Sequence, residues 1–229
     1  MNRTSPLTVT VVMALLDGEP HLGECLAAID AQTRPPHQVV IVDGGSTDGS
    51  RERVAAWGRA TVLDIPNAGW HRALNAAAGV ATGDLVAVTS SDDRLDRRAL
   101  ERHTDALAAA PEAGYSYGRV ALFADAGGVS DSVPEALDGT TPSARVLEAL
   151  AIRRSVLDRV GGFRPDLRHS ADVEWVARLG DLGIVPAVID EVVVAKRLHT
   201  ANTTYTQPDV TAGITRSLRL SILRKQGRA

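Results

Sequence analysis

The chain has 229 residues, which is enough for one large domain with a full hydrophobic core. Its 25 Lys and Arg are balanced by 28 Asp and Glu, and only 3% of residues are aromatic, which argues against nucleic-acid binding. The single cysteine, Cys25, excludes an internal disulfide and a thiolate zinc cluster. An apolar run at residues 9–16 is too short to cross a membrane, and no small-residue cleavage site follows it. We therefore expect a cytoplasmic globular protein.

Strand-like and helical patterns alternate through the first half of the chain. Apolar runs rich in β-branched residues predict strands at residues 9–15, 39–42, 61–65 and 85–89. Apolar residues at helical spacing predict the helices between and after them, at residues 21–31, 50–57, 70–81 and 95–109. This alternation is typical of βαβ units, so we predict an α/β fold with a mostly parallel central sheet flanked by helices.

The pattern is less regular in the second half. The predicted elements are a strand at 115–123, an irregular segment at 127–142, helices at 143–160 and 171–182, one or two strands at 184–198, and a helix at 209–225. We therefore predict one domain of residues 1–229. It has a nucleotide-binding-like half at 1–110, a mixed back half at 111–208, and a basic C-terminal helix at 209–229.

Two adjacent carboxylates, Asp92 and Asp93, follow a predicted strand in the sequence VTSSDDRL. One interpretation is structural, because Ser and Asp favour the N-terminus of a helix. The other is a divalent-cation site, because neighbouring carboxylates repel each other without a nearby positive charge, and hard oxygen ligands suit Mg²⁺ or Mn²⁺. Asp43 also follows a strand, and ligands of parallel sheets bind beyond the carboxyl ends of the strands. We expect both acidic loops at this edge, which favours the second interpretation.

Polar residues in the next turns give further candidates. In IVDGGSTDGS, Ser46 and Asp48 can cap the following helix, whereas Asp43 precedes the turn and can accept hydrogen bonds from a base or a ribose. Arg72 lies in the first turn of the helix at residues 70–81. It is either a contact to a base or diphosphate, or a solvated surface arginine.

The back half adds acids at a helix start and basic residues at a strand end. In VGGFRPDLRHSADVEW, Asp172 and Glu174 open a predicted helix. They either complement the helix dipole or supply a general base for an acceptor hydroxyl. In RLHTANTT, Arg197 and His199 are two residues apart, so strand alternation points them to the same side, where they suit a phosphate and a metal ion.

Five stretches occur in the order IVDGGSTDGS, NAGWHRALNAAAGVATGD, SSDD, VGGFRPDLRHSADVEW and RLHTANTT. In this order they resemble the family 2 glycosyltransferases with the GT-A fold, over about residues 9–204. The resemblance implies a hexosyltransferase-type enzyme that moves a sugar from a nucleotide-diphosphate donor to an acceptor hydroxyl or other nucleophile. Most members invert the anomeric carbon. It also implies a divalent cation, Mn²⁺ or Mg²⁺, as the cofactor.

The resemblance implies a role for each candidate residue. The expected roles are base contact for Asp43, nucleotide contact for Arg72, ribose or sugar contact for Asp92, metal binding for Asp93 and His199, and catalytic base for Asp172. Further candidates are Asp17, Glu174 and Arg197. Asp17 lies in the loop ALLDGEPHLGECL, which departs from the family pattern of an aromatic residue or Asn followed by Glu. We expect Asp17 to supply part of that polar role.

Other functions stay open at this point. A nucleotidyltransferase that makes a sugar nucleotide would need a basic phosphate loop after the first strand, which LLDGEPHLGE lacks. A non-catalytic domain that binds a nucleotide sugar is disfavoured by the retained acids. The acceptor can be a glycan, a lipid-linked molecule or a small molecule. We expect the basic C-terminal helix to cover the core, with a homodimer contact or a peripheral contact at the inner membrane face as alternatives.

Overall fold

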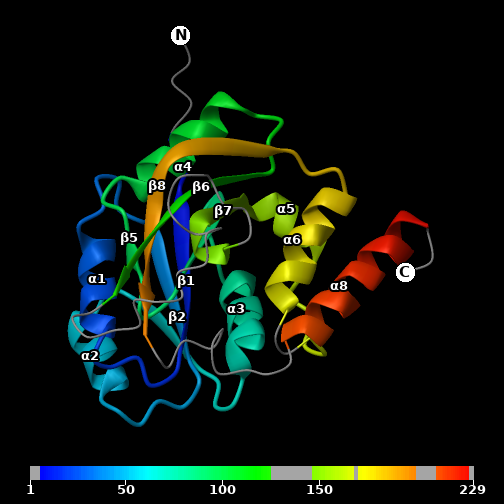
Figure 1. The fold of residues 1–229 in the computed structure, drawn as a ribbon. Coiled ribbons are helices and arrows are strands. Elements are labelled where there is room, and N and C mark those ends of the chain that lie inside the picture. The colour runs from blue at the N-terminus through cyan, green and yellow to red at the C-terminus, as the bar shows by residue number, and fades with distance from the viewer. Residues whose placement is uncertain (1–5, 125–145, 168–169, 200–209, 227–229) are drawn as a thin grey trace.

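An eight-stranded sheet forms the centre of the protein, with helices on both of its faces (Figure 1). The computed structural model describes residues 6–124, 146–167, 170–199 and 210–226, so the predicted irregular segment at 127–142 lies outside the described residues. In their order across the sheet, the strands are β3 (Thr61–Asp64), β2 (Gln38–Asp43), β1 (Val9–Leu15), β4 (Leu85–Thr89), β7 (Leu150–Arg153), β6 (Tyr115–Ala124), β8 (Pro186–Leu198) and β5 (Arg94–Leu95). The predicted α/β fold with a mostly parallel sheet is confirmed.

The carboxyl ends of β1, β2 and β4 meet at one edge of the sheet. β1 lies between β2 and β4 and runs parallel to both. Leu15, at the end of β1, is opposite Asp43, and Met13 is opposite Thr89. The loops after these three strands therefore leave the same edge, as expected for Asp43 and the SSDD segment.

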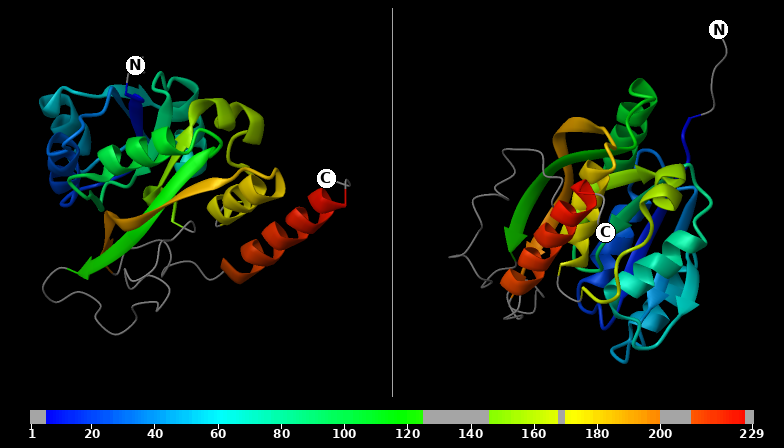
Figure 2. Two further views of the ribbon diagram at one scale, coloured as in Figure 1. Left: turned by 90° about the horizontal axis from the view of Figure 1, so that it is seen from above. Right: turned by 90° about the vertical axis from the view of Figure 1, so that its right-hand side faces the viewer.

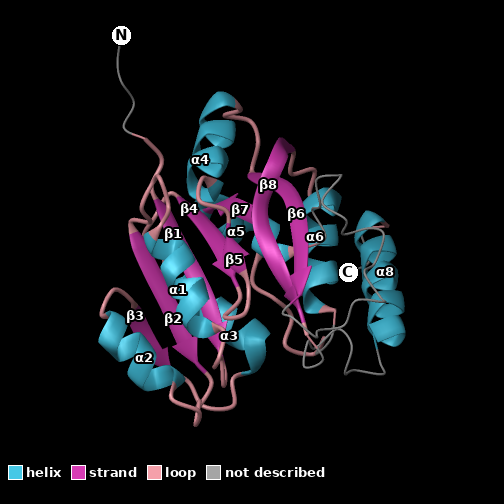
Figure 3. Cartoon of the chain, turned by 60° about the vertical axis from the view of Figure 1, so that its left-hand side comes forward, coloured by secondary structure: helices cyan, strands magenta, loops and turns pink. Residues whose placement is uncertain are grey.

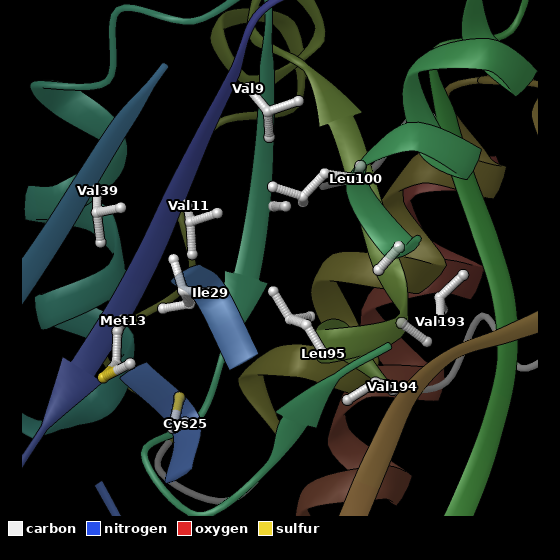
Figure 4. Packing of buried hydrophobic residues seen from close by; sticks show 14 of the residues in the cluster. Val9, Val11, Met13, Cys25, Ile29, Val39, Leu95, Leu100, Val193 and Val194 are labelled. Atoms are coloured by element: carbon white, nitrogen blue, oxygen red, sulfur yellow. The ribbon is translucent and has the colours of Figure 1, made fainter. Parts of the chain in front are cut away.

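Alternating side chains of the strands supply two hydrophobic layers. On one face, Val9, Val11 and Met13 of β1 pack with Cys25 and Ile29 of the first helix (Figure 4). The helices on this face are α1 (Leu22–Asp30), α2 (Ser50–Trp57) and α4 (Ala99–Ala109), of which α1 and α2 lie side by side (Figure 3). The helices on the other face are α3 (Gly69–Gly79), α5 (Arg154–Val160) and α6 (Ala171–Asp181).

Residues 143–160 do not form the single helix that their pattern predicts. The described part of this segment contains a 3₁₀ turn, η2 (Leu147–Ala149), followed by β7 and α5. β7 pairs with β4 on one side and β6 on the other, so pairing inside the sheet outweighs the helix propensity of LEALAIRR. Arg94 and Leu95 likewise form a short strand against β8, where the sequence predicts the start of a helix.

The C-terminal helix α8 (Val210–Lys225) packs along α6 at one end of the molecule (Figure 2). Its Arg224 lies 2.6 Å from Glu174 and 2.8 Å from Asp181, both on α6. Glu174 is fully buried and pairs with Arg178 of its own helix as well as with Arg224 of α8, so its carboxylate joins α6 to α8. This placement differs from the predicted role of Glu174 as a general base. No helix in the described ranges combines the length and apolar character needed to cross a membrane.

Arg224→Met withdraws a largely buried cation from two carboxylates, and we expect it to lower the free energy of unfolding by about 2 kcal/mol. The loss is smaller than the roughly 3–5 kcal/mol of a fully orphaned buried charge, because Arg178 still pairs with Glu174. Urea denaturation measures the change. Arg219→Met is the matched control, since Arg219 is exposed on the same helix. Equal unfolding midpoints for the two variants would show that these ion pairs do not stabilise the fold.

Candidate active site

The loops after β1 and β2 are joined by hydrogen bonds between small polar groups. The Thr47 N–H donates to the Asp17 carboxylate at 2.7 Å, and the Asp17 N–H donates to Ser46 Oγ at 3.0 Å. Asp17 has a φ of 48°, in the left-handed region that Asp enters more readily than most residues. Asp17 is exposed at the sheet edge, and these hydrogen bonds hold it in a defined position.

Asp43 is only 2% exposed, and its carboxylate is bonded within its own surroundings. Ser46 donates to it from both its hydroxyl and its N–H, the latter at 3.1 Å. Arg51 of α2 pairs with Asp43 at 3.0 Å and also with Asp64 at the end of β3. Arg51 thus bridges the carboxyl ends of two strands, and the base contact of Asp43 stays a prediction.

Helix α3 joins the front half to the segment between α5 and α6. Arg72 is exposed in its first turn. Asn75, one turn later, accepts the Phe163 N–H at 2.7 Å and donates to the Phe163 carbonyl at 2.8 Å. A Cβ at Gly162 would lie 2.6 Å from the Asn75 side chain, so this close approach requires glycine. Phe163 also packs against Trp175 of α6, with ring centres 5.2 Å apart.

The two acids after β4 have different surroundings. Asp93 is 1% exposed; Lys196 Nζ lies 2.6 Å from one of its oxygens, and the Arg197 N–H donates to the other at 3.0 Å. Burial raises the pKa of Asp93 to about 6, although Lys196 opposes the rise. The Asp92 side chain is 26% exposed, and its Oδ2 lies 3.0 Å from Nε2 of His199. The more accessible pair is therefore Asp92 and His199.

Glu148 of η2 is a second carboxylate beside Lys196. Its Oε1 lies 3.2 Å from Lys196 Nζ and accepts a hydrogen bond from Ser90 Oγ at 2.6 Å. Burial acts to raise the pKa of Glu148, but the charge of Lys196 and the bond from Ser90 outweigh it and lower the pKa. Burial acts to lower the pKa of Lys196, but Glu148 and Asp93 raise it, so the lysine stays charged.

Arg197 is 1% exposed and supports the same loop from the interior. Its Nε donates to the Asp92 carbonyl at 3.1 Å, and its Nη2 pairs with Glu24 of α1 at 2.6 Å. The guanidinium carbon lies 4.6 Å from the centre of the Phe123 ring, a cation–π contact. The structure thus places Arg197 as a support for the backbone of Asp92 and not as an exposed phosphate contact.

Asp172 lies half-buried in the first turn of α6. Burial raises the pKa of Asp172, the charge of Glu148 raises it further, and Lys196 lowers it. Asp172 thus interacts electrostatically with Glu148 and Lys196, which contact the SSDD loop. A raised pKa makes a carboxylate a stronger base, which suits it to accept a proton.

The accessible side chains of this region suit a divalent cation. Asp92 offers a hard oxygen and His199 an imidazole nitrogen, a combination that Mn²⁺ accepts. Within the described residues, no three His, Cys, Asp or Glu side chains form a cluster that could hold a metal by itself. Donor phosphate oxygens and water would therefore have to complete the coordination. Four acids, Asp92, Asp93, Glu148 and Asp172, interact electrostatically with one lysine, Lys196. Negative charge therefore exceeds positive charge among these five residues.

Sequence reasoning missed several residues of this region, namely Glu24, Arg51, Asn75, Glu148 and Lys196. Glu148 was concealed because the segment around it has a helical pattern. Lys196 did carry a usable signal, because it is one of two lysines among the 25 Lys and Arg residues and directly precedes RLH.

Comparison with known proteins assigns the chain to a family. A sequence model of glycosyl transferase family 2 matches residues 10–164, which is more than half of the chain, and the chain belongs to this family. Glycosyltransferase AglE of Haloferax volcanii is 25% identical over 198 residues, or 80% of this chain and 64% of AglE. Uncharacterized glycosyltransferase alr2836 of Nostoc is 30% identical over 101 residues, or 42% of this chain and 31% of that protein. The chain thus spans less than two thirds of these relatives.

Solved structures share the fold. TarS residues 1–349 of S. aureus, in complex with UDP-GlcNAc, has a TM-score of 0.78 at 16% identity, over 95% of this chain and 66% of that chain. The mannosyltransferase PcManGT of Pyrobaculum calidifontis, in complex with GDP-Man and Mn²⁺, has a TM-score of 0.71 at 20% identity, over 96% of this chain and 65% of that chain. At these identities the likeness establishes the GT-A fold.

Proposed function

We propose that this chain transfers a sugar from a nucleotide-diphosphate donor to an acceptor hydroxyl, with inversion at the anomeric carbon. One observation supports the proposal: Lys196 interacts electrostatically both with Asp92, which is paired with His199, and with Asp172, a half-buried acid with a raised pKa. In the proposed reaction this pair would hold a metal ion and Asp172 would act as the base. Membership of glycosyl transferase family 2 supports the reaction class.

In this proposal Asp172 is the general base. The acceptor oxygen attacks the anomeric carbon while its O–H proton moves to the Asp172 carboxylate. The bond from the anomeric carbon to the diphosphate oxygen breaks, and its electron pair leaves with the nucleoside diphosphate. Attack on the face opposite the leaving group inverts the anomeric centre, and no covalent intermediate with the protein is needed.

Asp92 and His199 are proposed to hold the divalent cation, in place of the Asp93 and His199 pair that the resemblance implies. The reason is that both oxygens of Asp93 are engaged, one by Lys196 and one by the Arg197 N–H. A bound Mn²⁺ or Mg²⁺ would neutralise negative charge on the departing diphosphate.

The proposed nucleotide contacts follow the sheet edge. Arg72 is proposed to contact the nucleotide, and Asp43 and Asp17 the base and its surroundings. The proposed donors are UDP- and GDP-sugars, because TarS and PcManGT bind UDP-GlcNAc and GDP-Man. The proposed acceptor classes are a glycan, a lipid-linked molecule or a small molecule.

Thermal unfolding of the wild-type chain with UDP, GDP, CDP and ADP, each with and without Mn²⁺, tests the proposal. We expect UDP or GDP to raise the melting temperature and Mn²⁺ to enlarge the rise, because a ligand that binds only the folded state stabilises it. A ligand at 100 times its Kd adds about 2.7 kcal/mol. No rise with any nucleotide would contradict the proposal. Pyrophosphate release from a nucleoside triphosphate would indicate a nucleotidyltransferase, and binding without transfer or donor hydrolysis a non-catalytic domain.

A further inference from the structure

One ion pair holds both ends of the SSDD loop after β4. Glu148 of η2 accepts a hydrogen bond from Ser90 Oγ, at the start of the loop, at 2.6 Å. Lys196 of β8 binds Asp93, at the end of the loop, at 2.6 Å. The charged atoms of Glu148 and Lys196 are 3.2 Å apart. Asp92 lies between the two held residues, and its side chain is 26% exposed whereas that of Asp93 is 1% exposed.

The Glu148–Lys196 pair is expected to add little net stability to the fold. The side chains of Lys196 and Glu148 are 24% and 16% exposed, so both charges are largely removed from water. Desolvation of such a pair often costs as much as the attraction between its charges returns, and apolar residues of similar volume can be equally stable. The Glu148–Lys196 pair contacts both ends of a loop that carries the accessible Asp92, so a role in function explains its presence better than stability does.

The choice of lysine also fits a specific local need. This chain has 25 Lys and Arg residues, of which two, Lys196 and Lys225, are lysines. An ammonium is compact and directs its donors in three directions, so it can lie between Asp93 and Glu148. The planar fork of arginine is larger and favours two parallel bonds to one carboxylate.

We infer that Lys196 and Glu148 are positioning residues, whose ion pair fixes both ends of the SSDD loop so that Asp92 meets the cation-bound diphosphate of the donor. The inference rests on the proposed function and deepens it. Neither residue takes part in bond making or proton transfer. Loss of the pair loosens the loop, which Arg197 still contacts at Asp92 and Asp93, so the part of nucleotide affinity that depends on the metal is weakened while the metal-independent part is kept.

Calorimetric titration with UDP and with GDP, each in Mn²⁺ and in EDTA, tests the inference. The double variant Glu148→Gln, Lys196→Met replaces both charges by neutral side chains of similar size and leaves the net charge unchanged. We expect its nucleotide affinity in Mn²⁺ to fall about tenfold, as is typical when a residue that orients a metal ligand is lost, and its affinity in EDTA to stay unchanged. Lys225→Met removes the other lysine, whose side chain is 68% exposed, and is expected to alter neither affinity.

The single variant Lys196→Met leaves two largely buried carboxylates, Asp93 and Glu148, without their cation, whereas the double variant leaves only Asp93, which keeps its bond from the Arg197 N–H. Both variants are measured, so that the effect of an unpaired Glu148 is separated from the effect of losing the pair. A folded double variant with wild-type affinity in Mn²⁺ would overturn the inference and leave the proposed function intact. Equal losses in Mn²⁺ and in EDTA would indicate general damage to the nucleotide site, and would also overturn it. A wild-type chain that binds neither nucleotide would overturn the proposed function and the inference with it.

Discussion

Asp172→Asn is expected to lower kcat roughly a thousandfold with little change in donor affinity, because a general base contributes about 10²–10⁴ to the rate. The amide cannot take up the proton of the acceptor hydroxyl. Asn is close to Asp in size, so the fold is expected to persist. Steady-state kinetics with varied donor and acceptor measure the effect. A variant with wild-type kcat would remove Asp172 from the chemistry.

The pH profile gives a second readout of the same variant. Burial, reinforced by Glu148, raises the pKa of Asp172 above its ordinary 3.8. A base acts only when ionised, so wild-type activity is expected to fall as the pH drops through the raised pKa, and this acid limb is expected to vanish in Asp172→Asn. Between the ordinary and the raised pKa the folded state binds more protons than the unfolded state. The contribution of Asp172 to stability is therefore present at lower pH and lost as the pH rises through this window.

Asp92→Asn is expected to lower kcat/KM for the donor at least about a hundredfold at limiting Mn²⁺. The amide is a weaker metal ligand and carries no charge, and a loss of about 3 kcal/mol of transition-state stabilisation corresponds to a factor of roughly a hundred. The dependence of transfer on Mn²⁺ concentration measures the effect, and we expect it to shift to higher Mn²⁺. An unchanged Mn²⁺ dependence would exclude Asp92 as the ligand.

Asp93→Asn is the control that separates the two adjacent acids. The structure has Asp93 bonded to Lys196 and to the Arg197 N–H, so its substitution is expected to resemble loss of the Lys196 contact, with a decrease of about tenfold. The family resemblance makes Asp93 the direct metal ligand and predicts the opposite order. A larger loss for Asp93→Asn than for Asp92→Asn would restore Asp93 to that role.

Local pattern was sufficient to predict the front half of the fold, apart from the short strand β5. The apolar runs and helical spacings follow from short-range periodicity, and parallel pairing of β1 with β2 and β4 then places their loops at one edge. That reasoning placed Asp43 at the end of β2 and the SSDD segment directly after β4, at the edge of the candidate site. Local pattern failed at β7, because the Ala- and Leu-rich sequence there is compatible with a helix until β4 and β6 pair with it.

The sequence by itself determined which acids are present and at which edge of the sheet they occur. Only the tertiary structure decided which of them is accessible. Lys196 and Asp93 are 103 residues apart, and Glu148 and Ser90 are 58 residues apart, so no local periodicity reports their contacts. Glu174, like Asp172, is an acid in the first turn of α6, yet it pairs with Arg224, which is 50 residues away. The exposure and partners of a carboxylate depend on such long-range contacts, and these set its pKa and its access to a ligand.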